Sequence, residues 1–170
     1  CHTTSDIIDR TTLALNMLRE TPGSLHFIYD EKARKKEENM RMVEENFLNA
    51  IRNEEFLVYY QPKAELHDYS LCGAEALCRW KHNGEIIPPG AFIPVLEQSS
   101  HICTLDMYML EHVCRDIRRW LDIGLDVVRV SVNFSRVNLG NQKLAEQIIS
   151  TIRKYDVPFK YIEIEVTETT

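Results

Sequence analysis

Positive charge is scarce in this sequence relative to proteins that bind nucleic acid chains. Its 20 lysine and arginine residues are outnumbered by 26 aspartate and glutamate residues, which gives a net charge of −6. Proteins that bind DNA or RNA polymers usually carry a basic excess or a basic stripe, so we expect no such partner. A small phosphate ligand is compatible with an acidic protein, because carboxylates can hold a divalent metal ion that binds the phosphate.

Paired cysteines, a signal peptide and a membrane span are also missing. The five cysteines are an odd number, and none forms a CxxC or other metal-binding spacing, so a reducing, cytoplasmic setting is the simpler expectation. No basic segment followed by an apolar run opens the chain. No stretch approaches the ~18 apolar residues that a membrane span needs. We therefore expect no membrane segment in this chain, and tethering through a segment outside it stays open.

The first 52 residues differ in composition from the rest. Residues 1–30 contain a predicted amphipathic helix over 5–19, a Pro22-Gly23 break and a predicted strand over 24–29. Residues 31–52 begin with a nearly continuous run of charged side chains and continue with apolar residues at helical spacing, which predicts one long helix. A solvated linker is the simpler interpretation of this helix. A helix that mediates dimerisation or transmits a signal is the alternative.

From residue 53 onward, short apolar runs alternate with longer segments of helical periodicity. The predicted strands cover residues 56–61, 71–79, 127–134 and 161–166, and the predicted helices cover residues 105–121 and 142–155. This alternation is typical of βα units around a mainly parallel sheet, so the predicted fold class is α/β.

Three of the predicted strands have one apolar face and one polar face. Because side chains alternate across a strand, Glu75, Asn133 and Glu165 each lie on a polar face, near the end of the strand. A parallel sheet covered by helices on both sides has two apolar faces. A barrel explains the polar faces, because they look into its interior and form the active site at the C-terminal ends of the strands. The alternative is a one-sided sheet whose polar face meets water.

Under the barrel interpretation, the same three residues form a set of hard oxygen ligands. Two carboxylates and an amide oxygen at one mouth suit Mg²⁺, Mn²⁺ or Ca²⁺. Carboxylates inside a barrel are costly unless a cation or hydrogen bonds compensate them. The pattern therefore predicts a divalent metal site at Glu75, Asn133 and Glu165.

Five motifs in order resemble one known family. They are Tyr59-Tyr60-Gln61-Pro62, Gly73 to Trp80, Pro88 to Pro94, Ser131 to Ser135 and Glu163 to Glu168. Their order and spacing resemble the EAL family of cyclic di-GMP phosphodiesterases, which is named after the triplet Glu75-Ala76-Leu77. The resemblance implies that residues 53–170 are the N-terminal half of an EAL domain, and so the first half of a (β/α)8 TIM-like barrel.

The resemblance also implies a metal site and a substrate site. The family's metal ligands match Glu75, Asn133 and Glu165, and the implied ion is Mg²⁺ or Mn²⁺. Positions that hold cyclic di-GMP and its phosphate match three residues, Gln61, Leu77 and Arg79. A guanidinium fork suits a pair of phosphate oxygens. The implied reaction is metal-assisted hydrolysis of cyclic di-GMP to the linear dinucleotide pGpG.

Other parts of the family pattern lie at or beyond the ends of the chain. Glu168 matches a position that braces a neighbouring active-site loop, and a solvated carboxylate is the alternative. An Asp-Asp pair and a general base are expected beyond Thr170, so the catalytic residues themselves stay unassigned. Residues 1–30 resemble, more weakly, the C-terminal tail of a GGDEF-like domain, which makes residues 31–52 the charged linker helix between the two domains.

Two other classes of function stay open. A sensor would bind cyclic di-GMP without cleaving it, and an interaction module would act mainly through the helix over 31–52, for example as a homodimer. Two residues near the motifs have plain interpretations. Trp80 is expected to pack in the core rather than stack on a base, and Lys63 is expected in solvent rather than near a phosphate.

We predict that the isolated 170-residue chain does not hydrolyse cyclic di-GMP. A complete (β/α)8 barrel needs about 250 residues, rarely fewer than about 200, and the residues that complete the active site are expected outside this chain. A nucleotide-turnover assay with Mg²⁺ or Mn²⁺ checks this, and robust production of pGpG by the isolated chain would contradict it.

Overall fold

A computed structural model describes residues 3–4, 7–8, 10–12, 14–15 and 31–167. The chain divides into two compact units, Cys1–Met42 and Val43–Thr170, and the boundary falls inside helix α2 (Glu31–Arg52). The described residues between 7 and 15 are helical, in agreement with the predicted helix over 5–19. The predicted strand over 24–29 and residue Glu168 lie outside the described residues. No helix in the described part of the chain is long and apolar enough to cross a lipid bilayer.

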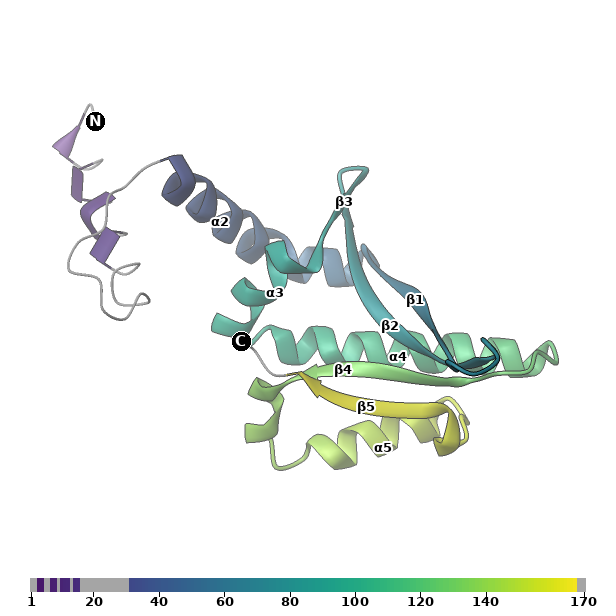
Figure 1. Ribbon diagram of the computed structural model, residues 1–170. Helices are drawn as coiled ribbons and strands as arrows, with labels where there is room; N and C mark the ends of the chain where they lie inside the picture. Colours follow the sequence, from purple (N-terminus) through teal and green to yellow (C-terminus); the bar gives the residue numbers. More distant parts are fainter. Residues whose placement is uncertain (1–2, 5–6, 9, 13, 16–30, 168–170) are drawn as a thin grey trace. The chain divides into compact units, whose positions relative to one another are not determined.

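The described part of the second unit contains one five-stranded mixed sheet (Figure 1). Four strands lie side by side in the order β1 (Phe56–Ala64), β2 (Leu71–His82), β4 (Arg129–Ser135) and β5 (Ile162–Thr167), and β3 (Glu85–Ile87) pairs with β2. The pairs β2–β4 and β4–β5 are parallel, as predicted.

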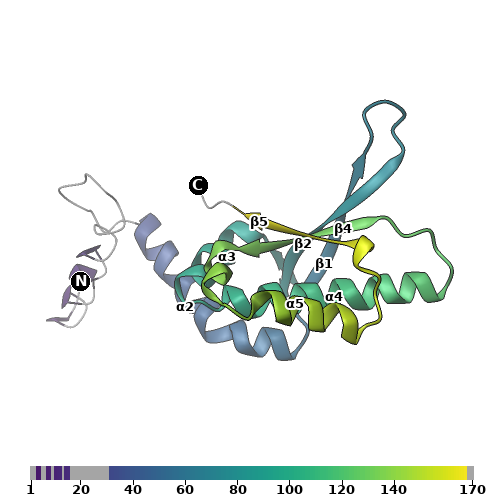
Figure 2. The ribbon, with the colours of Figure 1, turned by 90° about the horizontal axis from the view of Figure 1, so that it is seen from below.

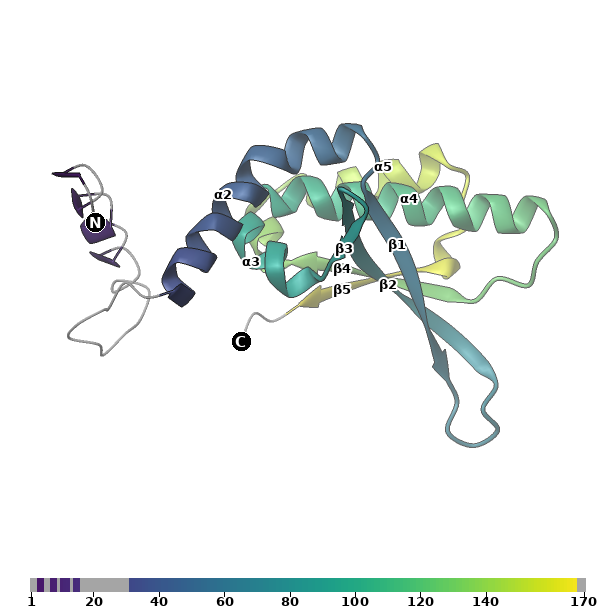
Figure 3. The same ribbon diagram turned by 90° about the horizontal axis from the view of Figure 1, so that it is seen from above.

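The prediction of a mainly parallel sheet is wrong for the first strand, because β1 pairs with β2 in antiparallel fashion. Parallel neighbours need a crossover connection of about a dozen or more residues, and residues 65–70 form only a hairpin loop. This hairpin extends well away from β4 and β5 (Figure 3). β2 pairs with β4 only over residues 73–76, the short stretch that carries Glu75.

Helices α4 (Ile102–Asp122) and α5 (Leu144–Lys154) lie along the same side of the sheet (Figure 2). The even-numbered residues of β4 are buried on this side: Val130, Val132 and Phe134. Helix α4 meets them with an apolar stripe that includes Leu110, Val113 and Ile117, all fully buried. The odd-numbered residues of the strands point to the opposite face, which neither α4 nor α5 covers.

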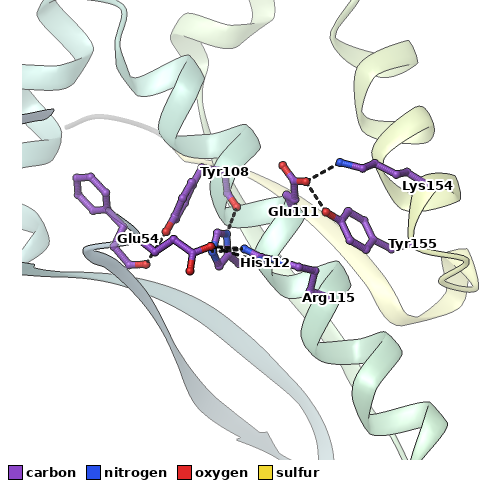
Figure 4. Close-up of polar contacts among 8 residues, drawn as sticks. Glu54, Tyr108, Glu111, His112, Arg115, Lys154 and Tyr155 are labelled. Carbon is purple, nitrogen blue, oxygen red and sulfur yellow. Dashed lines mark hydrogen bonds and ion pairs between the residues drawn. The ribbon is translucent and has the colours of Figure 1, made fainter. Parts of the chain in front are cut away.

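Polar contacts on the outer surface of α4 join it to its neighbours (Figure 4). Glu111 accepts hydrogen bonds from Lys154 at 2.7 Å and from Tyr155, which ties α4 to the end of α5. The bond from Lys154, which has the largest effect, and the bond from Tyr155 hold the pKa of Glu111 below its usual range. Arg115 lies 3.3 Å from Glu54, at the turn between α2 and β1. Such exposed pairs add little stability each, and they join α4 to the elements on either side.

Two elements that the sequence analysis did not predict follow β2 and precede α4 in the chain. Strand β3 forms a hairpin with β2 through Asn83 and Gly84, whose φ angles of 50° and 85° fit the two-residue turn that Asn-Gly favours. Helix α3 (Pro89–Gln98) begins with Pro89 directly after an extended Pro88. Proline suits the first helical position because the amide hydrogen it lacks would have no partner there. The motif from Pro88 to Pro94 is therefore a helix start.

An aromatic cluster fills the core where α2 ends. Phe47, Phe56, Trp80 and Phe92 are each at most 1% exposed. The ring of Phe56 lies 5.8 Å from Phe47, 5.1 Å from Trp80 and 5.6 Å from Phe92, measured between centroids. The indole nitrogen of Trp80 donates to Glu55 at 3.0 Å, so its polar atom is satisfied. The expectation that Trp80 packs in the core is confirmed.

We predict that Phe47→Ala lowers the free energy of unfolding by about 3–5 kcal/mol, because it leaves a cavity in this cluster. Leu48→Ala is the matched control, since its side chain is 50% exposed on the same helix, and it should cost about 0.5 kcal/mol or less. Urea unfolding of both variants checks the pair. Equal losses would show that the end of α2 is not part of the core.

Candidate functional site

The residues predicted to bind metal lie together on the odd-numbered face of the sheet. The strand register pairs Gln61 with Glu75, and Glu75 with Ser131, so these three side chains form one row across β1, β2 and β4. Asn133 pairs with Glu165 in the next row, two residues nearer the C-terminal ends of β4 and β5. The structure thus brings the two glutamates and the asparagine onto adjacent rows of one face.

A hydrogen bond joins two of the three predicted ligands. The amide nitrogen Nδ2 of Asn133 donates to Oε1 of Glu75 at 2.7 Å, and both side chains are half-buried. Since a carboxylate only accepts hydrogen bonds, the nitrogen end of the amide must face Glu75. The amide oxygen is thereby directed away from the carboxylate, where it can serve as a ligand for a cation.

The third predicted ligand, Glu165, is paired with a lysine. Nζ of Lys63 donates to Oε1 of Glu165 at 2.7 Å and to Oγ of Ser131 at 2.8 Å. The hydrogen bond from this ammonium holds the pKa of Glu165 below its usual range. The same bond raises the pKa of Lys63, so both groups are charged at neutral pH. The expectation of a purely solvated Lys63 is wrong.

The predicted substrate-binding residues lie on the same face. Gln61 is exposed on β1 at the row of Glu75, and Leu77 and Arg79 follow Glu75 along β2. The guanidinium carbon of Arg79 lies 5.6 Å from the ring centroid of Tyr59, and Nη1 donates to the carbonyl of Cys78 at 2.8 Å. Within residues 31–167, no hydrogen bond joins Gln61 or Arg79 to the predicted metal ligands.

The chemistry of the predicted ligands fits a small, hard cation. Among the described residues, no group of three or more His, Cys, Asp or Glu side chains is placed to hold a metal ion. The predicted donors that the structure brings onto one face are two carboxylates and one amide oxygen. Mg²⁺ commonly binds through one or two carboxylates and keeps several waters or substrate phosphate oxygens, which matches this set.

A cavity of about 160 Å³ adjoins the site between β2, β4, α3 and α4. Leu77 and Asn133 line it together with Asp106, a residue of α4 that the sequence analysis missed. Asp106 is only 6% exposed, and its Oδ2 accepts bonds from the backbone of Ser135 at 2.8 Å and from Asn138 at 2.6 Å. These bonds hold the turn that follows β4. Burial nevertheless raises the pKa of Asp106 to about 6.

The family assignment rests on the match of the EAL domain family to residues 44–170. This chain belongs to the EAL domain family. The solved EAL domains that it resembles have the TIM-barrel fold, and the chain covers part of them. The predicted fold class and the predicted EAL family are confirmed, and the GGDEF-like tail over residues 1–30 stays a prediction. The polar face of the sheet is accordingly the interior face of a partial barrel.

Several relatives and solved structures are similar to this chain. Signaling protein YkoW of Bacillus subtilis is 30% identical over 166 residues, which are 96% of this chain and 20% of YkoW. The cyclic di-GMP phosphodiesterase NbdA of Pseudomonas aeruginosa is 32% identical over 127 residues, 74% of this chain and 16% of NbdA. The structure of the PaMucR phosphodiesterase in complex with c-di-GMP has a TM-score of 0.69 and 27% identity, covering 75% of this chain and 52% of that one. The chain therefore spans a fifth or less of these curated relatives and about half of the solved structure.

Asp106 gives the EAL domain a predictable pH dependence. Its folded-state pKa of about 6 lies above the unfolded value near 3.9. The folded protein thus binds more protons than the unfolded chain between these values, and Asp106 costs more stability as the pH rises from about 4 to about 6. We predict that Asp106→Asn gains up to about 3 kcal/mol of stability relative to wild type between pH 4 and pH 7.

Chemical unfolding of both proteins across this pH range measures the difference, in which the titration of all other groups cancels. The exposed Asp126→Asn controls for the loss of a carboxylate. A difference between Asp106→Asn and wild type that does not change with pH would contradict the prediction.

Proposed function

We propose that the EAL domain that includes this chain hydrolyses cyclic di-GMP to pGpG with Mg²⁺ or Mn²⁺, and that Glu75, Asn133 and Glu165 are metal ligands. The observation that carries the proposal is the placement of these three oxygen donors on adjacent rows of one sheet face, joined by the bond from Asn133 to Glu75. Family membership supports it, as does the similarity to proteins named as cyclic di-GMP phosphodiesterases.

In this proposal the residues of the chain bind and orient the substrate. Arg79 provides a guanidinium fork for the phosphodiester, and Gln61 and Leu77 hold the dinucleotide on the same face as the metal ligands. The metal ion, when bound, supplies an activated water and stabilises charge on the phosphoryl oxygens. Asn133 keeps Glu75 in place through its amide nitrogen, and its oxygen would hold the ion. Glu168 braces the neighbouring loop.

The proposal extends to the organisation of the chain. Residues 1–30 are the C-terminal tail of a GGDEF-like domain, residues 31–52 are the linker helix, and residues 53–170 are the N-terminal half of the EAL domain. The Asp-Asp pair and the general base belong to the part of the barrel beyond Thr170. The protein works in the reducing setting of the cytoplasm, and α2 is the element through which it would form a homodimer.

We predict that Glu165→Gln lowers hydrolysis of cyclic di-GMP by more than about 100-fold in the full-length protein. The reason is that loss of even an outer partner of a metal ligand costs about 10–100-fold. Glu163→Gln is the matched control, because Glu163 lies on the same strand and the same face but one row further from the C-terminal end of β5. Its effect should stay within about threefold, and pGpG formation in the presence of Mg²⁺ or Mn²⁺ measures both.

The outcomes separate an enzyme from a sensor. Equal activity of the two variants would remove Glu165 from the metal site. Tight binding of cyclic di-GMP by the wild-type protein without any turnover would identify a sensor and overturn the proposed activity.

A further inference from the structure

Lys63 reaches the candidate metal site by crossing a neighbouring strand. It lies on β1, and its partner in the register on β2 is Gly73. A Cβ atom at position 73 would lie 3.8 Å from both Cβ and Cδ of Lys63, and 3.2 Å from the carbonyl oxygen of Arg129. The lysine side chain therefore runs over the one position of β2 that has no side chain. Its ammonium emerges on β4 and β5, at Ser131 and Glu165.

The strand register shows from which side the ammonium approaches. Lys63 and Gly73 form a row with Arg129, the Glu75 and Ser131 row follows, and the Asn133 and Glu165 row comes next. Lys63 thus reaches up two rows from the N-terminal side of the strands. In barrels of this kind the active site lies at the C-terminal side, so substrate and ion enter from the opposite direction.

One end of this contact is a buried hydroxyl group. Ser131 is 1% exposed, and its hydroxyl accepts from Lys63 at 2.8 Å and donates to the carbonyl of Ala74 at 3.4 Å. The other end is the Glu165 carboxylate, bonded at 2.7 Å. An ammonium anchored on a buried hydroxyl restricts the position of the carboxylate that it binds. Lys63 binds Oε1, one of the two oxygens of this carboxylate.

We propose that Lys63 is a positioning residue of the metal site. It binds Glu165 from the N-terminal side of the strands, so that the Glu165 carboxylate faces the ion. The inference rests on the proposed function, since it assigns Glu165 as a metal ligand. Partners in the second sphere of metal sites orient the ligands in this way, and their loss commonly costs about 10–100-fold in metal affinity. The competing arrangement is a lysine that only takes the place of the cation and must leave when the ion binds.

Metal affinity distinguishes the two arrangements. A positioning lysine predicts weaker Mn²⁺ binding when the charge of Lys63 is removed, and a lysine that takes the place of the cation predicts tighter binding. Mn²⁺ binding to the full-length protein would be measured by calorimetry or by the electron paramagnetic resonance of free Mn²⁺. We expect Lys63→Met, which keeps the length and loses the charge, to weaken Mn²⁺ binding by about 10–100-fold. Lys63→Arg, which retains the charge, should bind more tightly than Lys63→Met. The control is Lys143→Met, which removes an exposed lysine next to α5 and should change the affinity by less than about twofold.

A Mn²⁺ affinity of Lys63→Met equal to or higher than that of wild type would overturn the inference. Thermal unfolding checks that the variants are folded. If Lys63→Met does not fold, Ser131→Ala carries the test, since it removes only the anchor and should weaken Mn²⁺ binding by about tenfold; unchanged binding would overturn the inference. A wild-type protein that binds no Mn²⁺ would overturn the proposed function as well. A wild-type protein that binds and turns over normally, with an equally active Lys63→Met, would overturn this inference alone.

Discussion

The parallel ladder of β2, β4 and β5 is the constraint on which the site depends. It sets Glu75 beside Ser131 and Asn133 beside Glu165, although these residues come from strands separated by helices α4 and α5. A shift of the register by one residue would turn every side chain of a strand to the other face. The apolar even-numbered residues, packed against α4, prevent such a shift because it would expose them to the barrel interior. Core packing on one face thus holds the polar residues on the other.

Charge compensation on the polar face follows the same geometry. Isolated carboxylates on a half-buried surface are unfavourable, and each glutamate of the candidate site has a donor from another strand. Glu75 receives the amide of Asn133, and Glu165 receives the ammonium of Lys63. The bond from Lys63 holds the pKa of Glu165 below its usual range, so this carboxylate is ionised at neutral pH. Both glutamates on this face are thus held by donors from other strands of the same sheet.

Much of the fold could be predicted from periodicity, because the longer helices and the central strands bury one apolar face. The long helix over 31–52, the helix that became α4 and the alternation within β4 all follow from this. The antiparallel start of the sheet was missed although the short segment 65–70 excludes a parallel crossover. Strand β3 and helix α3 were missed because Asn83-Gly84 and Pro88-Pro89 were not interpreted as a hairpin turn and a helix start.

The sequence by itself determined which residue types face the barrel interior, since strict alternation along a strand needs only local information. It also determined the family, because five motifs occur in order. Only the tertiary structure decided which of those residues meet. Lys63 on β1 crosses β2 at Gly73 and reaches Glu165 on β5. Asp106 lines the adjoining cavity because α4 packs behind β4. Both contacts depend on the relative placement of distant segments, which local pattern does not encode.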